Sequence, residues 1–597
     1  MRQPKQVGLL LLFLITVIQG WADTRKSLYL ILATLCCASM LAIPARRGQW
    51  QTITLSDGSQ VRVELRGDER CHWWEDSLGN RYCNRGRTKE DGVRRNDTEI
   101  WELVNNKEQS LGTSRKGSRA RKNSPSSLLP TPYSDNIFNL PPSPFNGSRK
   151  GIIILVEFAN KQFRDENDRD LFDRIANERG FSERGFKGCV SDYFRDQSGG
   201  MLDLTFDVIG PVTVSNDYEY YGKNVGPDNY DAHPDEMIVE ACKLVDDEVD
   251  FSDYDWNHDG YVEQVVVIYA GQGEANGGSK NTIWPHEWEL VETDYGKTLR
   301  LDKVRINTYA CSPELSSSTR IDGIGTLCHE FAHCLGLPDM YDEDGKNYGM
   351  SYWDLMDLGS YNGDGFRPAG FTAYEKMFCG WQQPIVLSKD TVVLEMHAIS
   401  EGGDTYIIYN NVYPNEYYML ENRQKTGWDK SLLGSGLLIT HIDYNPDIWT
   451  WNVVNSFSTY YDIYDHEYTN DHERCTIFHA DNDNASTLIG IIGDPYPYLF
   501  NDSLTVNSRP ATTLYHKDSR GNDRLQVAIK KIKKNEDNTI SFQFFQRSNY
   551  PSGMHHVKVH SNQDNPIYSM EGIFLGTDKQ RLPKGVYIIG GKKTVIP

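Results

Sequence analysis

The chain has 597 residues, of which 39% are hydrophobic and 12% aromatic, and it carries a formal net charge of -21. A chain of this length exceeds what one hydrophobic core can organise, so several domains are expected. The acidic balance argues against nucleic acid as a partner and instead indicates a solvated surface with cation sites.

Residues 1–45 read as an export signal region. Two apolar runs occur there, at residues 7–18 and 28–43, and basic residues precede each of them. The second run ends in Ile43-Pro44-Ala45, which is a suitable cleavage boundary, so it is the expected working signal. A start codon recorded upstream of the true one would explain the first run, which is too short to span a bilayer as part of a hairpin. No later segment is long and apolar enough to span one, so the mature chain is expected to have no stable membrane span.

Residues 46–146 predict a small β-containing domain followed by a linker. Alternating residues at 52–55 and 61–65 flank an Asp-Gly turn, which is typical of a hairpin. Cys71 and Cys83 could close it with a disulfide, the favoured pairing for an exported chain; a thiolate from this domain capping a metal is the alternative. Eleven cysteines are present, and removal of Cys36 and Cys37 with the signal leaves an odd number.

Residues 147–384 predict an α+β domain. A buried strand is expected at residues 151–157, with further strands at 201–208 and 264–269. Helices are expected at residues 186–197 and 234–247. Together these elements form the scaffold that would position the polar motifs described next.

An acidic turn immediately precedes the predicted strand at residues 264–269. Oxygen-bearing side chains alternate there and a glycine follows, which resembles the first half of a calcium loop. The expected calcium ligands are Asp255, Asn257, Asp259, the Tyr261 carbonyl and Glu263. A helix-loop-helix site is disfavoured, because Val266 stands where a bidentate glutamate is needed. A plain acidic turn before a buried strand is the alternative.

The strongest motif lies at residues 329–339, which read His-Glu-Phe-Ala-His-Cys-Leu-Gly-Leu-Pro-Asp. On a helix, His329 and His333 stand one turn apart, so both imidazoles can reach one zinc ion. Glu330 lies beside the open coordination position and is the expected general base for a zinc-bound water. Gly336 and a following proline end the helix, and Asp339 emerges from that turn as the third expected ligand.

The apolar residues of the same helix support this interpretation. Leu327, Cys328, Phe331 and Leu335 fall on one stripe that would anchor the helix in a core, while the histidines project to the opposite side. The whole motif resembles the long zinc signature in which a third ligand follows a glycine turn. Met356, downstream, resembles the methionine of the turn that lies beneath zinc in such enzymes, as a hydrophobic base and not a ligand.

The chain as a whole resembles the immune inhibitor A family of secreted bacterial zinc metalloproteases. The resemblance covers most of residues 46–545 and rests on the zinc motif and on further segments at residues 191–194, 210–212, 283–286, 374–376, 380–381, 418–423 and 479–482. It implies an endopeptidase acting on protein or peptide substrates, in a secreted or outer-membrane surface location of a bacterium. It also implies that residues 46–146 are a propeptide, cleaved near the basic run at residues 115–122.

Two alternatives stay open. A zinc hydrolase of a non-protein amide or ester would use the same residues, and a catalytically silent cell-surface binding protein would keep a vestigial site. Retention of every motif residue weighs against the second alternative. The residue that stabilises the oxyanion is not assigned, because Leu358 stands where related enzymes place a tyrosine. The candidates are Tyr352, Tyr361 and His286, and a structural role is the alternative for each of them.

The C-terminal part of the chain predicts two further regions. Residues 385–548 contain short apolar runs between turn residues and are expected to be β-rich. Residues 479–484 could bind another calcium ion or form a polar loop, and Trp449, Trp451 and Tyr460 could contact a ligand or pack among strands. Residues 549–597 resemble the sorting domain read by the type nine secretion machinery; an edge hairpin of the preceding region is the alternative.

Overall fold

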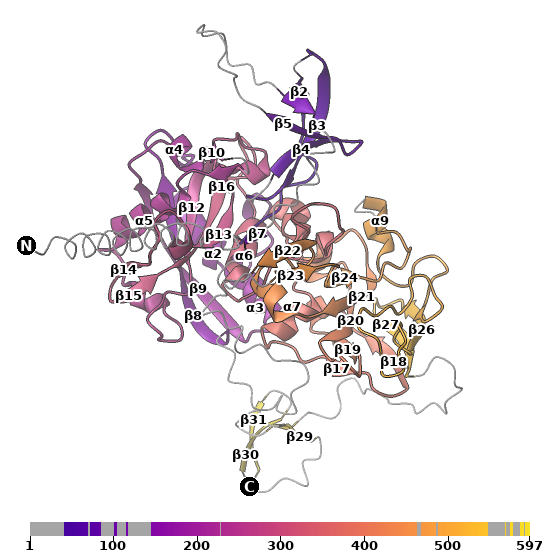
Figure 1. The fold of residues 1–597 in the computed structure, drawn as a ribbon. Helices are drawn as coiled ribbons and strands as arrows, with labels where there is room; N and C mark the ends of the chain where they lie inside the picture. The colour runs from indigo at the N-terminus through magenta and orange to yellow at the C-terminus, as the bar shows by residue number, and fades with distance from the viewer. Residues whose placement is uncertain are drawn as a thin grey trace, which may run out of the picture.

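The structure is a computed structural model that describes residues 41–55, 57–69, 72–84, 101–103, 115–116, 145–226, 229–461, 467–484 and 488–546, with short strands beyond residue 566. It has a mixed helix and sheet fold, as predicted. Figure 1 shows a small N-terminal sheet standing off a larger body in which two strand-rich parts lie next to each other. No helix within the described residues is long and apolar enough to cross a membrane.

A six-stranded sheet organises the first half of the body. Its order is β1-β13-β16-β12-β8-β9, in which β8, β9, β12 and β16 are parallel and β13 and β1 complete one edge in antiparallel pairing. The bounds are β1 (Leu41–Ala42), β8 (Gly147–Glu157), β9 (Leu202–Thr213), β12 (Val265–Gln272), β13 (His286–Glu289) and β16 (Thr308–Leu315). The strands expected at 151–157, 201–208 and 264–269 are therefore confirmed.

Helices cover both faces of this sheet because successive side chains of a strand point to opposite sides. In β8, Ile153 and Leu155 join the core that contains α2, α3 and α6, whereas Ile152 and Ile154 join the core beneath α5. The bounds of these helices are α2 (Arg169–Asn177), α3 (Val190–Gln197), α5 (Pro234–Val245) and α6 (Ile324–His333). Both predicted helices, at 186–197 and 234–247, are present with their starts or ends shifted by a few residues.

The N-terminal sheet contains the predicted hairpin. Its order is β2-β3-β4-β5-β6, and Ile53 pairs with Val61 across the hairpin. The bounds are β2 (Trp50–Thr54), β3 (Gln60–Gly67), β4 (His72–Asp76), β5 (Arg81–Asn84) and β6 (Trp101–Leu103). Cys71 and the side chain of Cys83 lie outside the described residues, so the disulfide remains a prediction.

The region after residue 384 is β-rich, as predicted, and it shares a core with the first half of the body. Along β20 (Glu416–Arg423), Tyr418 and Leu420 face a second sheet, whereas Tyr417 and Met419 join the core of α3 and α6. The two sheets have the orders β17-β19-β20-β21-β24 and β18-β27-β26-β25. A sheet buried on both faces cannot separate as an independent accessory domain without exposing apolar surface.

The remaining bounds of this region follow. The strands are β17 (Ile385–Val386), β18 (Thr391–Met396), β19 (Tyr406–Tyr409), β21 (Gly436–Asp443), β22 (Ser458–Tyr461), β23 (Glu467–Asn470), β24 (Cys475–Ile477), β25 (Leu504–Thr505), β26 (Ala528–Lys534) and β27 (Ile540–Phe545), and the helices are α7 (Ala373–Phe378), α8 (Pro446–Thr450) and α9 (Leu488–Gly493). Trp449 and Trp451 are buried in the core, which favours packing over ligand contact, and the side chain of Tyr460 is outside the described part of the chain.

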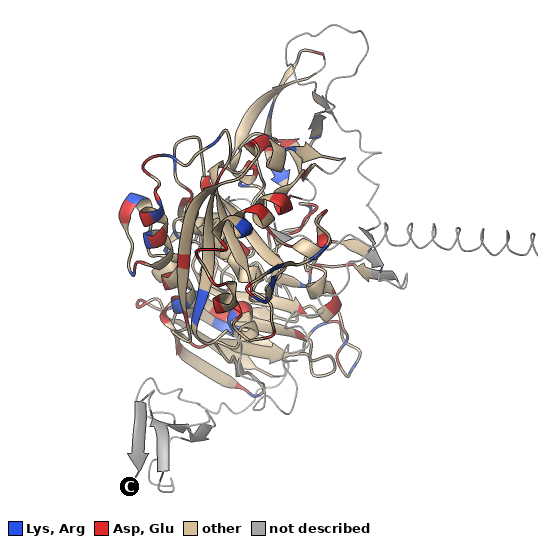
Figure 2. Ribbon diagram, turned by 90° about the vertical axis from the view of Figure 1, so that its left-hand side faces the viewer, with Lys and Arg blue, Asp and Glu red and all other residues tan. Residues whose placement is uncertain are grey.

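Shorter elements complete the fold. The small strands are β7 (Arg115–Lys116), β10 (Asn224–Val225), β11 (Tyr230–Asp231), β14 (Leu299–Leu301) and β15 (Val304–Ile306), and α4 spans Tyr218–Gly222. The C-terminal tail forms a separate antiparallel sheet of β28 (Ile567–Tyr568), β29 (Phe574–Gly576), β30 (Gly585–Ile589) and β31 (Lys592–Ile596). Figure 2 shows Asp and Glu positions interspersed with Lys and Arg positions along the ribbon.

Candidate metal centre and its surroundings

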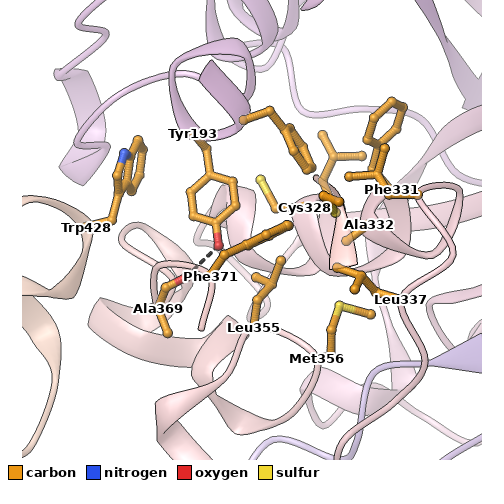
Figure 3. Close-up of a cluster of buried hydrophobic side chains, with 14 of the residues drawn as sticks. Tyr193, Cys328, Phe331, Ala332, Leu337, Leu355, Met356, Ala369, Phe371 and Trp428 are labelled. Atoms are coloured by element: carbon orange, nitrogen blue, oxygen red, sulfur yellow. Dashed lines mark hydrogen bonds between the residues drawn. The ribbon is translucent and has the colours of Figure 1, made fainter. Parts of the chain in front are cut away.

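Helix α6 is anchored through its apolar stripe, as predicted. Leu327, Cys328, Phe331 and Leu335 are all buried. Figure 3 shows Cys328 and Phe331 in a cluster with Tyr193, whose hydroxyl donates to the carbonyl of Ala369. On another side of the helix, Gly325 lets the backbone of Ser360 approach closely, because a β-carbon at Gly325 would lie 1.8 Å from the Ser360 carbonyl oxygen. The 3-10 segment η8 (Leu358–Gly365) therefore packs directly against α6.

The three predicted zinc ligands converge. Asp339 Oδ1 lies 3.1 Å from His329 Nε2 and 3.5 Å from His333 Nε2, and the two imidazole rings are nearly perpendicular. All three side chains are almost fully buried. Among the residues that the structure describes, these three form the group of His, Cys, Asp or Glu side chains that could hold a metal ion, with ligand atoms within 4.8 Å of one another.

The remaining ring nitrogens are held by backbone carbonyls. His329 Nδ1 donates to the Leu355 oxygen at 2.8 Å, and His333 Nδ1 donates to the Leu337 oxygen at 2.7 Å. A donating Nδ1 leaves Nε2 with its lone pair, which is the form that binds a metal. The Leu337 contact depends on the turn at Gly336, whose φ of +86° is the left-handed conformation expected at a helix end.

Asp339 is fixed by a residue that the sequence did not reveal. Asn452 Nδ2 donates to Asp339 Oδ2 at 2.5 Å, and the Asp339 amide donates to Asn452 Oδ1 at 2.6 Å. This two-point clamp leaves Asp339 Oδ1 directed at the histidines. Asn452 is 113 residues away in the β-rich region, and it belongs to no motif with recognisable spacing, so only the tertiary structure brings it here.

Substituting Asn452 by Ala is expected to weaken zinc binding by roughly 10- to 100-fold, the usual cost of losing a residue that orients a ligand. Competition with a zinc-binding dye would measure the change. Asn501→Ala is the matched control, because the Asn501 side chain also makes two hydrogen bonds, but to the carbonyls of Ala480 and Arg509 and not to a metal ligand. An affinity in Asn452→Ala equal to that of the control would contradict the clamp.

Glu330 is enclosed on the same helix. Its side chain is fully buried, and Oε2 has no hydrogen-bond partner among the described residues. Burial raises the pKa of Glu330 well above its usual value, and the negative charges of Asp339 and Glu69 add to the effect. Its other oxygen, Oε1, accepts a hydrogen bond from the Ile43 amide at 3.1 Å. An N-terminal segment that the sequence assigned to the export signal therefore reaches the predicted general base.

Met356 lies in the turn that supports the ligands. It is fully buried, its amide donates to Asp354 Oδ1 at 2.8 Å, and its carbonyl accepts from the Met340 amide at 2.8 Å. The preceding residue, Leu355, supplies the carbonyl that holds His329. Figure 3 shows Met356 and Leu355 at one border of the buried cluster.

Of the candidate oxyanion donors, His286 has a structural position. Its Nδ1 donates to the Trp284 carbonyl at 2.7 Å, and its Nε2 lies 3.1 Å from the Tyr309 hydroxyl, which donates to it. Burial lowers the pKa of His286 to about 4. The Tyr361 hydroxyl instead donates a hydrogen bond to the Pro44 carbonyl at 2.8 Å. Tyr352 packs against the apolar cluster that contains Tyr361.

The His286 environment predicts a pH dependence of stability. The folded state holds the imidazole neutral down to about pH 4, whereas the unfolded state takes up a proton near pH 6.5. The contribution of neutral His286 to the free energy of unfolding is therefore complete above pH 6.5. It falls as the pH drops toward 4, by about 3 kcal/mol in total. Denaturant unfolding across this range should show a smaller loss in His286→Gln than in the parent protein. His397→Gln, at an exposed position, should follow the parent; equal slopes in all three proteins would refute the assignment.

The predicted calcium loop folds around its own oxygen atoms. Asp255 accepts from the amides of Asp259 and Gly260, Asn257 Oδ1 accepts from the Asp259 amide, and Asp259 Oδ1 accepts from the Tyr261 amide. Glu263 accepts from the Trp256 amide at 2.7 Å. Burial raises the pKa of Glu263 to about 8, with the charges of Asp255 and Asp259 adding to the effect. The oxygens are thus gathered in one turn, and calcium binding there stays a prediction.

Comparison with known proteins finds relatives of the part of the chain that contains the candidate metal centre. Residues 148–383 match the family described as the immune inhibitor A peptidase M6 catalytic domain. The chain is 27% identical over 221 residues to a pre-pro-metalloprotease, PrtV, of Vibrio cholerae, covering 31% of this chain and 23% of that protein. It is 30% identical over 218 residues to immune inhibitor A of Bacillus thuringiensis subsp. alesti, covering 31% of each.

The match has a defined extent. The chain spans less than a third of the length of the relatives. The residues that match the family, 148–383, end before Asn452 and the β-rich region. The matched domain is a peptidase catalytic domain, and the Vibrio relative is by name a pre-pro-metalloprotease.

Proposed function

We propose that the protein is a zinc-dependent endopeptidase that hydrolyses peptide bonds. The observation that carries the proposal is the convergence of His329 Nε2, His333 Nε2 and Asp339 Oδ1, all buried, beside the fully buried carboxyl of Glu330. Two imidazoles and one carboxylate form a common ligand set of catalytic zinc. His329 Nε2 and Asp339 Oδ1 lie 3.1 Å apart and have no hydrogen-bond partner among the described residues, which suits atoms that share a cation.

The residues around the centre divide the chemistry between them. Zinc held by the three ligands would polarise the scissile carbonyl and lower the pKa of water toward 7. Glu330 would take the proton of the attacking water and pass it to the leaving amine. Asn452 and the backbone carbonyls of Leu337 and Leu355 would keep the ligands oriented, and Met356 would lie beneath them as part of a methionine turn.

The substrate would bind along β13. This strand is the outermost strand of the central sheet apart from the two-residue β1, so its outer edge can take up an extended peptide through main-chain hydrogen bonds. Such binding recognises the peptide backbone, which supports peptides as substrates over other amides or esters. The sequence alone did not indicate which strand would do this.

The N-terminal domain would act as a propeptide. Its side chains contact residues 147–384, which carry the candidate zinc ligands and are called the catalytic half below. Arg81 donates to the Asp344 carbonyl at 2.9 Å, and the His72 ring stacks on Trp284 with centroids 4.9 Å apart. Glu69 is buried close enough to Glu330 to raise its pKa. We propose that cleavage in the linker, near the basic run at residues 115–122, releases this domain. Export from the cell and a sorting role for the tail sheet belong to the same proposal, as does calcium at residues 255–263.

Metal removal tests the function directly. Protein purified after processing should cleave an unfolded protein substrate, lose activity on dialysis against a chelator, and regain it on addition of about one equivalent of zinc. Magnesium is the control, because it prefers six oxygen ligands and should not restore activity. Cleavage that persists in a zinc-free sample, as checked by elemental analysis, would refute the proposal.

A further inference from the structure

The N-terminal segment, residues 41–46, crosses the catalytic half as an extended strand. β1 adds to the open edge of β13 in antiparallel register, with Leu41 opposite Glu287 and Ala42 opposite His286. The next amide, of Ile43, donates to Glu330 Oε1. The segment thus runs as an extended strand from the sheet edge to the predicted general base, the path that an extended substrate would take.

Two side-chain donors fix the next two carbonyls of the segment. Trp284 Nε1 donates to the Ile43 oxygen at 2.9 Å, and the Tyr361 hydroxyl donates to the Pro44 oxygen at 2.8 Å. These donors come from different elements, the loop before β13 and η8. Both acceptors are main-chain atoms, so the contacts are available to any peptide of suitable length.

The Ile43 side chain is fully buried in an apolar cluster. Four members of that cluster come from the catalytic half: Ala275, Trp284, Leu358 and Tyr361; we call these the Ile43 subsite. Two others, Ala45 and Leu65, belong to the N-terminal part and would leave with it. Release of the N-terminal part would therefore uncover an apolar subsite next to Glu330.

We infer that residues 41–46 occupy the substrate position and that the Ile43 subsite selects an aliphatic side chain beside the cleaved bond, with the Tyr361 hydroxyl binding the carbonyl of the following residue. This inference rests on the proposed function. The cleavage boundary that the sequence predicts for the export signal, after Ala45, falls within this packed segment, in which Ile43 and Ala45 are buried. A charged side chain at the position of Ile43 would lose its hydration without gaining a partner from these four residues.

The first test needs no catalysis. In the full chain, Ile43→Asp should expel the segment, and hydrogen exchange should show lost protection at residues 286–289. Ile43→Ala, a milder change, should show partial loss while circular dichroism and melting confirm a folded protein. A synthetic peptide of residues 39–46 should restore protection to the Ile43→Asp protein, whereas the same peptide with Asp in place of Ile should bind at least roughly 10-fold more weakly.

The second test uses the processed, zinc-loaded enzyme. Mass spectrometry of a digested unfolded protein should show Ile, Leu or Val enriched at one position near the cleaved bonds. For matched peptides, kcat/KM should favour Ile over Ala by roughly 10- to 200-fold. Leu358→Ala should shift the preference toward larger side chains, and Tyr361→Phe should raise KM for all peptides without changing the order. Leu394→Ala, at an exposed position in the β-rich region, is the control.

The outcomes are separable. Equal binding of the Ile and Asp peptides, or an enzyme whose side-chain preference is unchanged by Leu358→Ala, would overturn the subsite. An inactive zinc-loaded protein that still binds the Ile peptide selectively would overturn the proposed function and leave the binding position supported.

Discussion

Replacing Glu330 by Gln is expected to lower kcat for peptide hydrolysis by roughly 10²- to 10⁴-fold, the usual contribution of a positioned general base. Gln has nearly the same shape and keeps an oxygen that can accept from the Ile43 amide, so the fold and the contact with the N-terminal segment should persist. Gln cannot take a proton from water, and it is this step that the variant removes. Activity on an unfolded protein substrate and zinc content by elemental analysis are the two measurements.

The control for this variant is Glu178→Gln, which changes an exposed residue at the end of α2 that pairs with Arg174. It should retain parental activity. Zinc content near one equivalent in Glu330→Gln would assign the loss of activity to proton transfer and not to loss of the metal. If the variant kept activity within 10-fold of the parent, Glu330 would not be the base.

Replacing Arg423 by Met is expected to destabilise the protein by about 3–5 kcal/mol, because it leaves buried carboxylates without their partner. Arg423 is completely buried; it donates to Asp429 at 2.7 Å, to Glu421 at 3.1 Å and to the Gly370 carbonyl at 3.1 Å. Gly370 belongs to the catalytic half, and its amide donates to Asp429 at 2.8 Å. The network therefore joins the β-rich region to the catalytic half.

Denaturant unfolding would measure this effect. Arg174→Met is the matched control, because Arg174 also pairs with two carboxylates but is partly exposed, and pairs at the surface contribute about 0–1 kcal/mol. Both halves of the body should unfold in one transition, since they share a core. A variant as stable as the control, or one that loses only the β-rich region, would contradict the proposed coupling.

The convergence of the candidate zinc ligands could be predicted from the sequence because these residues are close together in the chain. His329, Glu330 and His333 lie on one helix, where the helical repeat fixes which side chains are neighbours. Asp339 follows a glycine turn only six residues beyond His333, so its arrival near the histidines depends on short-range geometry. The strands of the central sheet and helices α3 and α5 were predictable for the same reason, since each depends on apolar periodicity within a dozen residues.

Residues that act across long separations in sequence were not predictable. Asn452 clamps Asp339 from the β-rich region, and Ile43 reaches Glu330 across 287 positions. An asparagine or an isoleucine carries no spacing that distinguishes such a contact from ordinary packing. The apolar run that ends at Ile43 satisfied the pattern of an export signal, and nothing in that pattern encodes the edge of β13.

The candidate metal ligands, the candidate base and the helix that carries them were all predictable from the sequence, because they depend on the helical repeat and on one turn. The tertiary structure decided that the β-rich region completes the catalytic half, since both faces of β20 are buried. It also decided which sheet edge lies beside Glu330 and that residues 41–46 occupy it. Those features arise from how separate elements pack, and packing between distant segments leaves no local periodic signal.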